Sequence, residues 1–145
     1  MVAIPNELVS ALERAGCAVE LNAPLARKVF WRTGGAADVL VEATSAEQVA
    51  AVQHIAKSHD VAITIVGAGS NVLISDAGIR GVTLTMSGAL TTLDILEDNG
   101  ESVLLRAGAG LKLAVFLNRL GPLDVGGFGA LVGVPGTIGG AVRMN

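Results

Sequence analysis

DVLVEATSAEQVAAVQHIAKSHDVAITIV, residues 38–66, decides the first half of the fold. Residues 38–42 and 62–66 are short apolar runs with several β-branched side chains, and each run predicts a strand. Between them, Ser45 and Gln48 have the spacing of a capping box, which predicts the start of a helix. A strand, a helix and a strand of these lengths predict a βαβ unit with a right-handed crossover and parallel strands.

A glycine-rich loop follows the second strand of this unit. It consists of Gly67, Ala68, Gly69, Ser70 and Asn71. Ligands of βαβ units bind beyond the carboxyl ends of the strands, which is where this loop lies. Glycine lets backbone N–H groups approach an anion closely, and the serine and asparagine add side-chain donors. The loop therefore predicts a phosphate cradle, although a tight strand exit explains the same residues equally well.

A second glycine-rich loop lies near the end of the sequence. It consists of Gly133, Val134, Pro135, Gly136, Thr137, Ile138, Gly139, Gly140 and Ala141. Thr137 is placed to cap a helix that starts near Ile138. One such loop by itself fits a tightly packed turn better than a ligand site. Two of them in one domain favour a long diphosphate ligand.

The N-terminal region predicts a helix and then an irregular connection. Leu8, Val9 and Leu12 share one helical face, and Gly16 is placed to end that helix. Residues 17–37 show no steady hydrophobic period, so we expect an extended connection with a tight glycine turn.

From Gly81 onward the pattern changes to short strands. The runs that predict them are 82–86, 93–97 and 102–107. Asn99 and Gly100 form a hairpin signal, so we expect an antiparallel second lobe. Residues 111–120 then predict a helix with one apolar side.

Composition excludes several classes of protein. The chain is 51% hydrophobic and 16% charged, which is too apolar for intrinsic disorder, and its net charge of -3 with no basic run argues against nucleic acid. No Cys/His cluster has metal-ligand spacing. Cys17 is the single cysteine, so we expect no internal disulfide and a small buried side chain. The absence of a signal peptide and of a long apolar span predicts a cytoplasmic protein with no membrane partner.

Three blocks of sequence point to a known family. They are Arg32-Thr33-Gly34-Gly35-Ala36-Ala37, Gly67-Ala68-Gly69-Ser70-Asn71-Val72-Leu73 and Gly133-Val134-Pro135-Gly136-Thr137-Ile138-Gly139-Gly140-Ala141. In this order and spacing they resemble the UDP-N-acetylenolpyruvoylglucosamine reductase family, over residues 21–145. The second block alone also resembles other flavoproteins of the vanillyl-alcohol-oxidase type.

The resemblance implies an α+β fold, a two-lobed FAD-binding domain of the vanillyl-alcohol-oxidase (PCMH) type. A βαβ lobe is followed by a mainly antiparallel lobe. The implied divisions are 1–20 for an N-terminal helix and lead-in, 21–86 for the first FAD-binding lobe and 87–145 for part of the second. The family's C-terminal substrate-binding domain is absent, so the resemblance implies a chain truncated at its C-terminus.

The resemblance also implies a chemistry and a set of binding residues. FAD accepts hydride from NADPH and passes it to the enolpyruvyl group of a UDP-sugar, which gives UDP-N-acetylmuramate for peptidoglycan synthesis. The implied cofactor-binding residues are Arg32, Thr33, Gly34, Gly35, Gly67, Ala68, Gly69, Ser70, Asn71, Gly133, Val134, Pro135, Gly136, Thr137, Ile138, Gly139 and Gly140. The family's catalytic serine, arginine and glutamate are expected beyond Asn145, so we expect this chain alone to be inactive.

Alternatives stay open at this point. The chain fits a non-catalytic FAD- or nucleotide-binding module, or another FAD oxidoreductase of the same fold. Arg32 suits a surface ion pair as well as a diphosphate contact, and Arg143 is a weaker candidate for an anionic ligand. Phe30 and Trp31 are expected to pack in the core. We expect an exposed apolar face where the rest of a longer enzyme docks, and this face predicts self-association.

Overall fold

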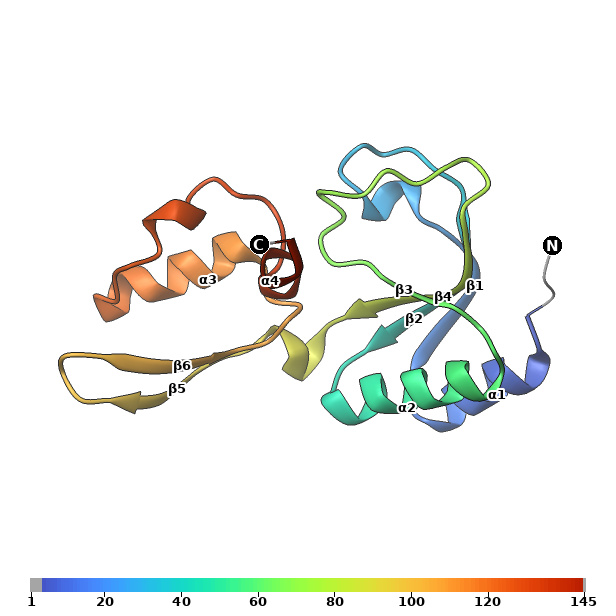
Figure 1. Ribbon diagram of the computed structural model, residues 1–145, viewed down its shortest axis with the longest axis horizontal. Coiled ribbons are helices and arrows are strands. Elements are labelled where there is room, and N and C mark those ends of the chain that lie inside the picture. Colours follow the sequence, from blue (N-terminus) through green and yellow to red (C-terminus); the bar gives the residue numbers. More distant parts are fainter. Residues whose placement is uncertain (1–3, 145) are drawn as a thin grey trace.

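The computed structural model describes residues 4–144 and places them in two lobes side by side (Figure 1). A four-stranded sheet forms one lobe, and a two-stranded sheet with the last helices forms the other. The elements in chain order are α1 (Asn6–Arg14), β1 (Ala18–Pro24), η1 (Ala26–Lys28), β2 (Ala36–Ala43), α2 (Ala46–Ser58), β3 (Ile63–Ile65), β4 (Ile79–Met86), η2 (Gly88–Thr91), β5 (Leu93–Asp98), β6 (Val103–Ala107), α3 (Leu113–Leu120), η3 (Gly121–Leu123), η4 (Gly129–Leu131) and α4 (Ile138–Met144).

The first sheet has the strand order β1-β2-β4-β3, with β1 antiparallel to β2 and both β2 and β3 parallel to β4. The two strands of the predicted βαβ unit are therefore parallel, as expected, but β4 lies between them. The pattern-based expectation that the strand at residues 82–86 is antiparallel is wrong, whereas the division implied by the resemblance already placed these residues in the first lobe. Val82, Thr83 and Leu84 are fully buried because β4 is a central strand, covered on both faces.

Helices α1 and α2 cover one face of this sheet (Figure 1). Leu8 and Leu12 of α1 and Val52 of α2 are fully buried in a cluster with the strand residues Val41 and Val82. The buried positions of Leu8 and Leu12 confirm the predicted apolar face of α1. Burial of each aliphatic side chain contributes about 1.5–3 kcal/mol, so this cluster is the main source of stability in the first lobe.

The start of α2 confirms the predicted cap, with one change. The Gln48 N–H donates to Ser45 Oγ at 3.3 Å, but Gln48 Oε1 accepts from the N–H of Thr44 at 2.7 Å, one residue before the cap. The Gln48 side-chain Nε2 also donates to the carbonyl of Gly16 at 2.8 Å. One side chain thus closes the cap and ties α2 to Gly16, two residues after the end of α1.

Strand β1 lies in a region that was expected to be an extended connection. Residues 17–37 contain this strand and the 3-10 helix η1, so the prediction of an irregular connection is wrong there. Only Ala23 of β1 is buried, and Asn22, with φ +50°, forms no pair with β2, although the register is the same on both sides of it. Because β1 is an edge strand paired on one side, its sequence carries almost no periodic burial signal.

A second apolar cluster covers the other face of the first sheet. Leu25 and Val29 pack there with Leu40 of β2 and with Ile74 from the segment after β3. Gly34, in the glycine turn of this region, packs against Ile74. These long loops lie above the sheet in Figure 1, opposite α1 and α2.

Phe30 and Trp31 do not enter that core. Their side chains are 67% and 62% exposed, and their rings meet edge to face with centroids 5.5 Å apart. The expectation of core packing is wrong because the buried position in this segment is taken by Val29. Cys17 is buried as expected, and burial raises the pKa of its thiol.

The second lobe begins with the predicted hairpin. Strands β5 and β6 are antiparallel and joined by residues 99–102. Asn99 Oδ1 accepts the N–H groups of Glu101 at 3.0 Å and Ser102 at 2.7 Å, and Gly100 has φ +81°. Only glycine adopts this backbone conformation at no steric cost, which explains the Asn-Gly signal.

Helix α3 packs on the hairpin through its predicted apolar side. Phe116 and Leu120 are buried with Leu111, against the partly buried Leu105 of β6. Phe128 completes this small cluster with a T-shaped contact to Phe116, at a centroid distance of 5.0 Å. The division of the chain into residues 1–20, 21–86 and 87–145 stays a prediction.

Two further classes of feature are absent from the part of the chain that the structure describes. No helix within residues 4–144 is both long enough and apolar enough to cross a membrane. Nor do His, Cys, Asp and Glu side chains gather there in a group that could hold a metal ion.

Candidate functional site

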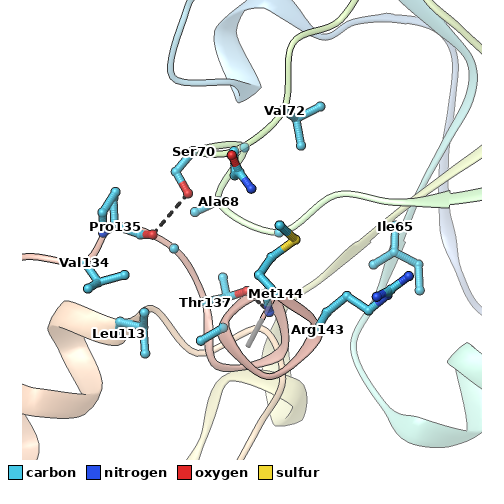
Figure 2. A pocket seen from close by; sticks show the side chains of 16 residues that line it. Ile65, Ala68, Ser70, Val72, Leu113, Val134, Pro135, Thr137, Arg143 and Met144 are labelled. Carbon is cyan, nitrogen blue, oxygen red and sulfur yellow. Dashed lines mark hydrogen bonds between the residues drawn. The ribbon is translucent and has the colours of Figure 1, made fainter. Parts of the chain in front are cut away.

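The two glycine-rich loops meet at a pocket of about 440 Å³ between the lobes (Figure 2). Residues 67–72 line it from the first lobe, together with Ile65 at the end of β3. Residues 134–137 and several side chains of α4 line it from the second lobe. The pocket thus lies beyond the carboxyl end of a parallel strand, where ligands of such sheets bind.

Close packing fixes the shape of the first loop. Gly69 has φ +66°, and a Cβ at this position would stand 2.6 Å from the carbonyl oxygen of Lys28. Its own carbonyl accepts the N–H of Phe30 at 3.0 Å. Glycine is required here by both backbone conformation and space, so the loop rests rigidly on residues 28–30.

Direct contacts join the two loops. Ser70 Oγ donates to the carbonyl oxygen of Pro135 at 3.2 Å, the dashed line in Figure 2. A Cβ at Gly67 would stand 2.7 Å from Thr137 Oγ1, so the absence of a side chain there lets the loops approach. Loops separated by more than 60 residues in sequence (Ser70 and Pro135 are 65 apart) therefore form one wall of a single site.

The second loop is held at both ends. Thr137 is buried, and its Oγ1 accepts the N–H of Gly140 at 3.2 Å, which confirms the predicted cap of α4. On the other side, the N–H of Leu113 donates to the carbonyl of Gly136 at 3.0 Å, at the start of α3. The loop is thereby anchored to two helices.

Some of the backbone donors of this site have no acceptor in the described part of the protein. Within residues 4–144, the N–H groups of residues 67–71 and those of Gly136 and Thr137 have no protein acceptor. A group of unpaired N–H donors on glycine-rich backbone fits the oxygens of a phosphate or diphosphate. The N–H donors of this site therefore fit the diphosphate oxygens of a dinucleotide.

The pocket brings together most of the residues expected to bind the cofactor. Those that line it are Gly67, Ala68, Gly69, Ser70, Asn71, Val134, Pro135, Gly136, Thr137 and Gly140. Those that do not line it are Arg32, Thr33, Gly34, Gly35, Gly133, Ile138 and Gly139. The binding role of both groups stays a prediction.

Gly34 and Gly35 have a packing function that explains their identity. A Cβ at Gly35 would stand 2.2 Å from the carbonyl oxygen of Asp76, and one at Gly34 would stand 2.7 Å from that of Ile74. The Gly35 N–H also donates to the carbonyl of Ser75 at 2.9 Å. These glycines let the segment before β2 pack against the segment that follows the first loop. This packing supports the first loop on the side of residues 74–76.

Several lining residues were not expected. Ile65, Val72, Leu113 and Met144 contribute apolar side chains to the pocket. Val72 lies in the block of residues 67–73 that carried the family resemblance, so the sequence held a signal for its place in the site. The others look like ordinary apolar positions of a strand or a helix, so only the fold brings them to the site.

A family comparison matches most of the chain. Residues 37–145 match the family described as FAD binding domain. Among curated proteins, the UDP-N-acetylenolpyruvoylglucosamine reductase of Rubrobacter xylanophilus is 36% identical over 134 residues, which are 92% of this chain and 43% of that protein. The enzyme of the same name from Bacillus subtilis is 40% identical over 134 residues, 92% of this chain and 42% of the relative. The chain thus spans less than half the length of these relatives.

Solved structures share the fold. UDP-N-acetylenolpyruvylglucosamine reductase from Thermus caldophilus superposes with a TM-score of 0.68 at 24% identity, over 89% of this chain and 42% of that one. A solvent-stable cholesterol oxidase superposes with a TM-score of 0.75 at 20% identity, over 99% of this chain and 26% of the oxidase. These likenesses confirm the predicted α+β fold of the vanillyl-alcohol-oxidase type.

Proposed function

The chain belongs to the FAD binding domain family, and from this premise we propose that it is the FAD-binding part of a peptidoglycan-precursor reductase. The proposed enzyme converts UDP-N-acetylglucosamine enolpyruvate to UDP-N-acetylmuramate, with NADPH as the hydride donor. The names of its relatives support this assignment. The observation that carries it is the pair of glycine loops joined by Ser70 and Pro135 around one pocket with unpaired N–H donors.

FAD is the cofactor of this family, and when bound it supplies the hydride-transfer chemistry. The residues of this chain bind and orient it. We propose that residues 67–71 hold the diphosphate through their free N–H groups, because no protein acceptor within residues 4–144 competes for them. Residues 133–140 are proposed to hold the flavin end, where Leu113 and Val134 add apolar surface that excludes water.

Arg32, Thr33, Gly34 and Gly35 are proposed to contribute to the same site. Support comes from the Phe30–Gly69 hydrogen bond, which places the segment before them against the first loop. The proposed lobes, residues 21–86 and 87–145, then each supply one glycine loop. FAD would lie at the boundary between them.

We expect that this chain alone does not reduce a substrate. The relatives are more than twice as long, and protonation of the reduced product requires an acid in the site. We propose that the serine donor and the assisting arginine and glutamate lie in the part of the relatives that this chain does not match. Because NADPH and UDP-sugars are cytoplasmic metabolites, the proposed location is the cytoplasm.

The direct test is retention of FAD. The purified chain is incubated with FAD and passed through gel filtration, and flavin absorbance is measured in the protein peak. We expect flavin to co-elute. A chain that circular dichroism shows to be folded, but that retains no flavin, would contradict the proposal.

A pair of glycine variants makes this test specific. Gly67→Val places a side chain against Thr137 Oγ1 and separates the loops, so we expect flavin retention to fall strongly. Gly126→Val is the matched control, since nothing lies within 4 Å of a Cβ built there. Equal retention by the two variants would show that the cofactor binds elsewhere.

One observation favours a second candidate, a non-catalytic FAD- or nucleotide-binding module. Among the described residues that line the pocket, Arg143 has the only ionisable side chain, so no carboxyl, thiol or imidazole is present to transfer a proton. Turnover measured on the protein that contains this chain separates the two candidates. Oxidation of NADPH that depends on the UDP-sugar excludes the non-catalytic module.

Self-association is a further proposal, supported by apolar side chains on the hairpin. Ile95, Leu96 and Leu104 are 48%, 44% and 51% exposed. Exposed apolar groups of this size promote association. We expect the sedimentation coefficient of the chain to rise with concentration, and Leu104→Lys to reduce this rise. A concentration-independent coefficient would exclude self-association.

A further inference from the structure

We propose that Arg143 pairs with a diphosphate of the ligand and makes the pocket select phosphorylated over unphosphorylated molecules. The inference rests on the proposed function, since it concerns the same pocket. It adds a charged residue that no glycine motif contains. Two diphosphates belong to the proposed reaction, that of FAD and that of the UDP-sugar, and the experiment below distinguishes them.

The position of Arg143 is the first support. The residue lies in α4 and lines the pocket together with the first glycine loop. In Figure 2 its side chain extends beside Ile65, on the opposite side of the pocket from the Ser70–Pro135 hydrogen bond. A ligand that spans the pocket therefore meets the unpaired N–H donors of the loops and the guanidinium group.

Charge is the second support. Within residues 4–144 no carboxylate lies within salt-bridge distance of Arg143, whereas Arg80 is paired with Asp38 at 2.7 Å. The chain carries a net charge of -3, yet the described lining of this pocket has one ionisable side chain and that side chain is cationic. The pocket is thus locally positive in an acidic protein, which favours an anionic ligand.

The chemistry of the guanidinium group is the third support. Arginine stays charged at all physiological pH values and presents several N–H donors in a planar fork that matches two phosphate oxygens. A riboflavin molecule offers it no such acceptor. Arg143 should therefore affect the binding of FAD and leave that of riboflavin unchanged.

The experiment measures the dissociation constants of FAD, riboflavin and UDP-N-acetylglucosamine for the purified chain and three variants. Arg143→Gln removes the charge and should weaken the binding of a diphosphate ligand about tenfold, the low end expected for a lost charged hydrogen bond. Arg143→Lys keeps a point charge without the fork and should weaken it less. Arg119→Gln in α3 is the matched control, because Arg119 is also exposed but does not line the pocket.

The outcomes separate the ligand sources. Weaker FAD binding in Arg143→Gln, with riboflavin unchanged and the difference reduced near 1 M salt, assigns the contact to the FAD diphosphate. A loss confined to UDP-N-acetylglucosamine assigns it to the sugar nucleotide. FAD binding by the unmodified chain with no change for either diphosphate in Arg143→Gln overturns this inference alone. Failure of the unmodified chain to bind FAD at all overturns the proposed function as well.

Discussion

The two lobes differ in how completely they bury their own apolar residues. In the first lobe, helices cover one face of the sheet and loops cover the other, and Val39, Val41 and Leu84 are fully buried. In the second lobe, α3 covers one face of a two-stranded hairpin, and Leu96 and Leu104 stay about half exposed. An isolated hairpin is marginally stable, so the second lobe should open more readily than the first.

This difference matters for the pocket because each lobe supplies one of its loops. The first loop rests on the stable sheet through the Gly69 contacts with residues 28–30. The second loop depends on α3 and α4, which belong to the less stable lobe. The Ser70–Pro135 hydrogen bond is one of the few links between the loops, so a bound ligand should stabilise the second lobe most.

The largest effect is expected from a cavity in the first lobe. Leu84 is fully buried in the central strand, so Leu84→Ala should lower the free energy of unfolding by about 2–5 kcal/mol. Leu104→Ala in the hairpin is the control, since its side chain is 51% exposed and the change should stay within about 0.5 kcal/mol. Urea denaturation of both variants measures the difference, and equal losses would contradict the comparison of the lobes.

Ligand binding should produce the next largest effect. FAD at about one hundred times its dissociation constant stabilises a protein that binds it only when folded by about 2.7 kcal/mol. We expect hydrogen exchange to slow most in residues 133–144 and in the β5–β6 hairpin. Protection confined to the first sheet would show that the ligand does not reach the second loop.

The sequence predicted the parts of the fold that depend on local pattern. The capping residues Ser45 and Gln48, the Asn99–Gly100 turn and the glycine loops each carry a signal within a few residues. The fold brought most of the predicted loop residues to one pocket. Such signals work because the steric and hydrogen-bonding requirement lies within the segment itself.

The parts of the fold that were predicted wrongly depend on contacts between residues that are distant in sequence. The run 82–86 has the same residues whether it pairs in a parallel or an antiparallel sheet, and only its partners β2 and β3 decide. Strand β1 is an edge strand with little burial, and Trp31 is exposed although its type favours the core. Leu113 enters the pocket because α3 meets the second loop, which no local pattern reveals.

A polar atom in the core of the first lobe offers a smaller, stabilising test. Thr83 is fully buried, and its Oγ1 has no hydrogen-bond partner within the described residues. Thr83→Val keeps the shape and removes the unpaired hydroxyl, so it should raise the free energy of unfolding by about 1 kcal/mol. Thr85→Val is the matched control, because Thr85 Oγ1 donates to the carbonyl of Val41 at 3.2 Å and its loss should destabilise. Thermal denaturation of both variants shows whether each change raises or lowers the free energy of unfolding. A destabilised Thr83→Val would mean that a bound water satisfies the hydroxyl.

An effect of similar size concerns the cap at the start of α2. Ser45→Ala removes the acceptor of the Gln48 N–H and should cost about 1 kcal/mol. Because Gln48 also bonds to Thr44 and Gly16, part of the cap should survive in that variant. Gln48→Ala keeps the backbone N–H that donates to Ser45 Oγ but loses the side-chain bonds to Thr44 and Gly16, and it should cost more than Ser45→Ala in the same urea titration. If Gln48→Ala causes no loss, the bonds of Gln48 to Thr44 and Gly16 add nothing, and the coupling of α1 to α2 rests on the apolar cluster alone.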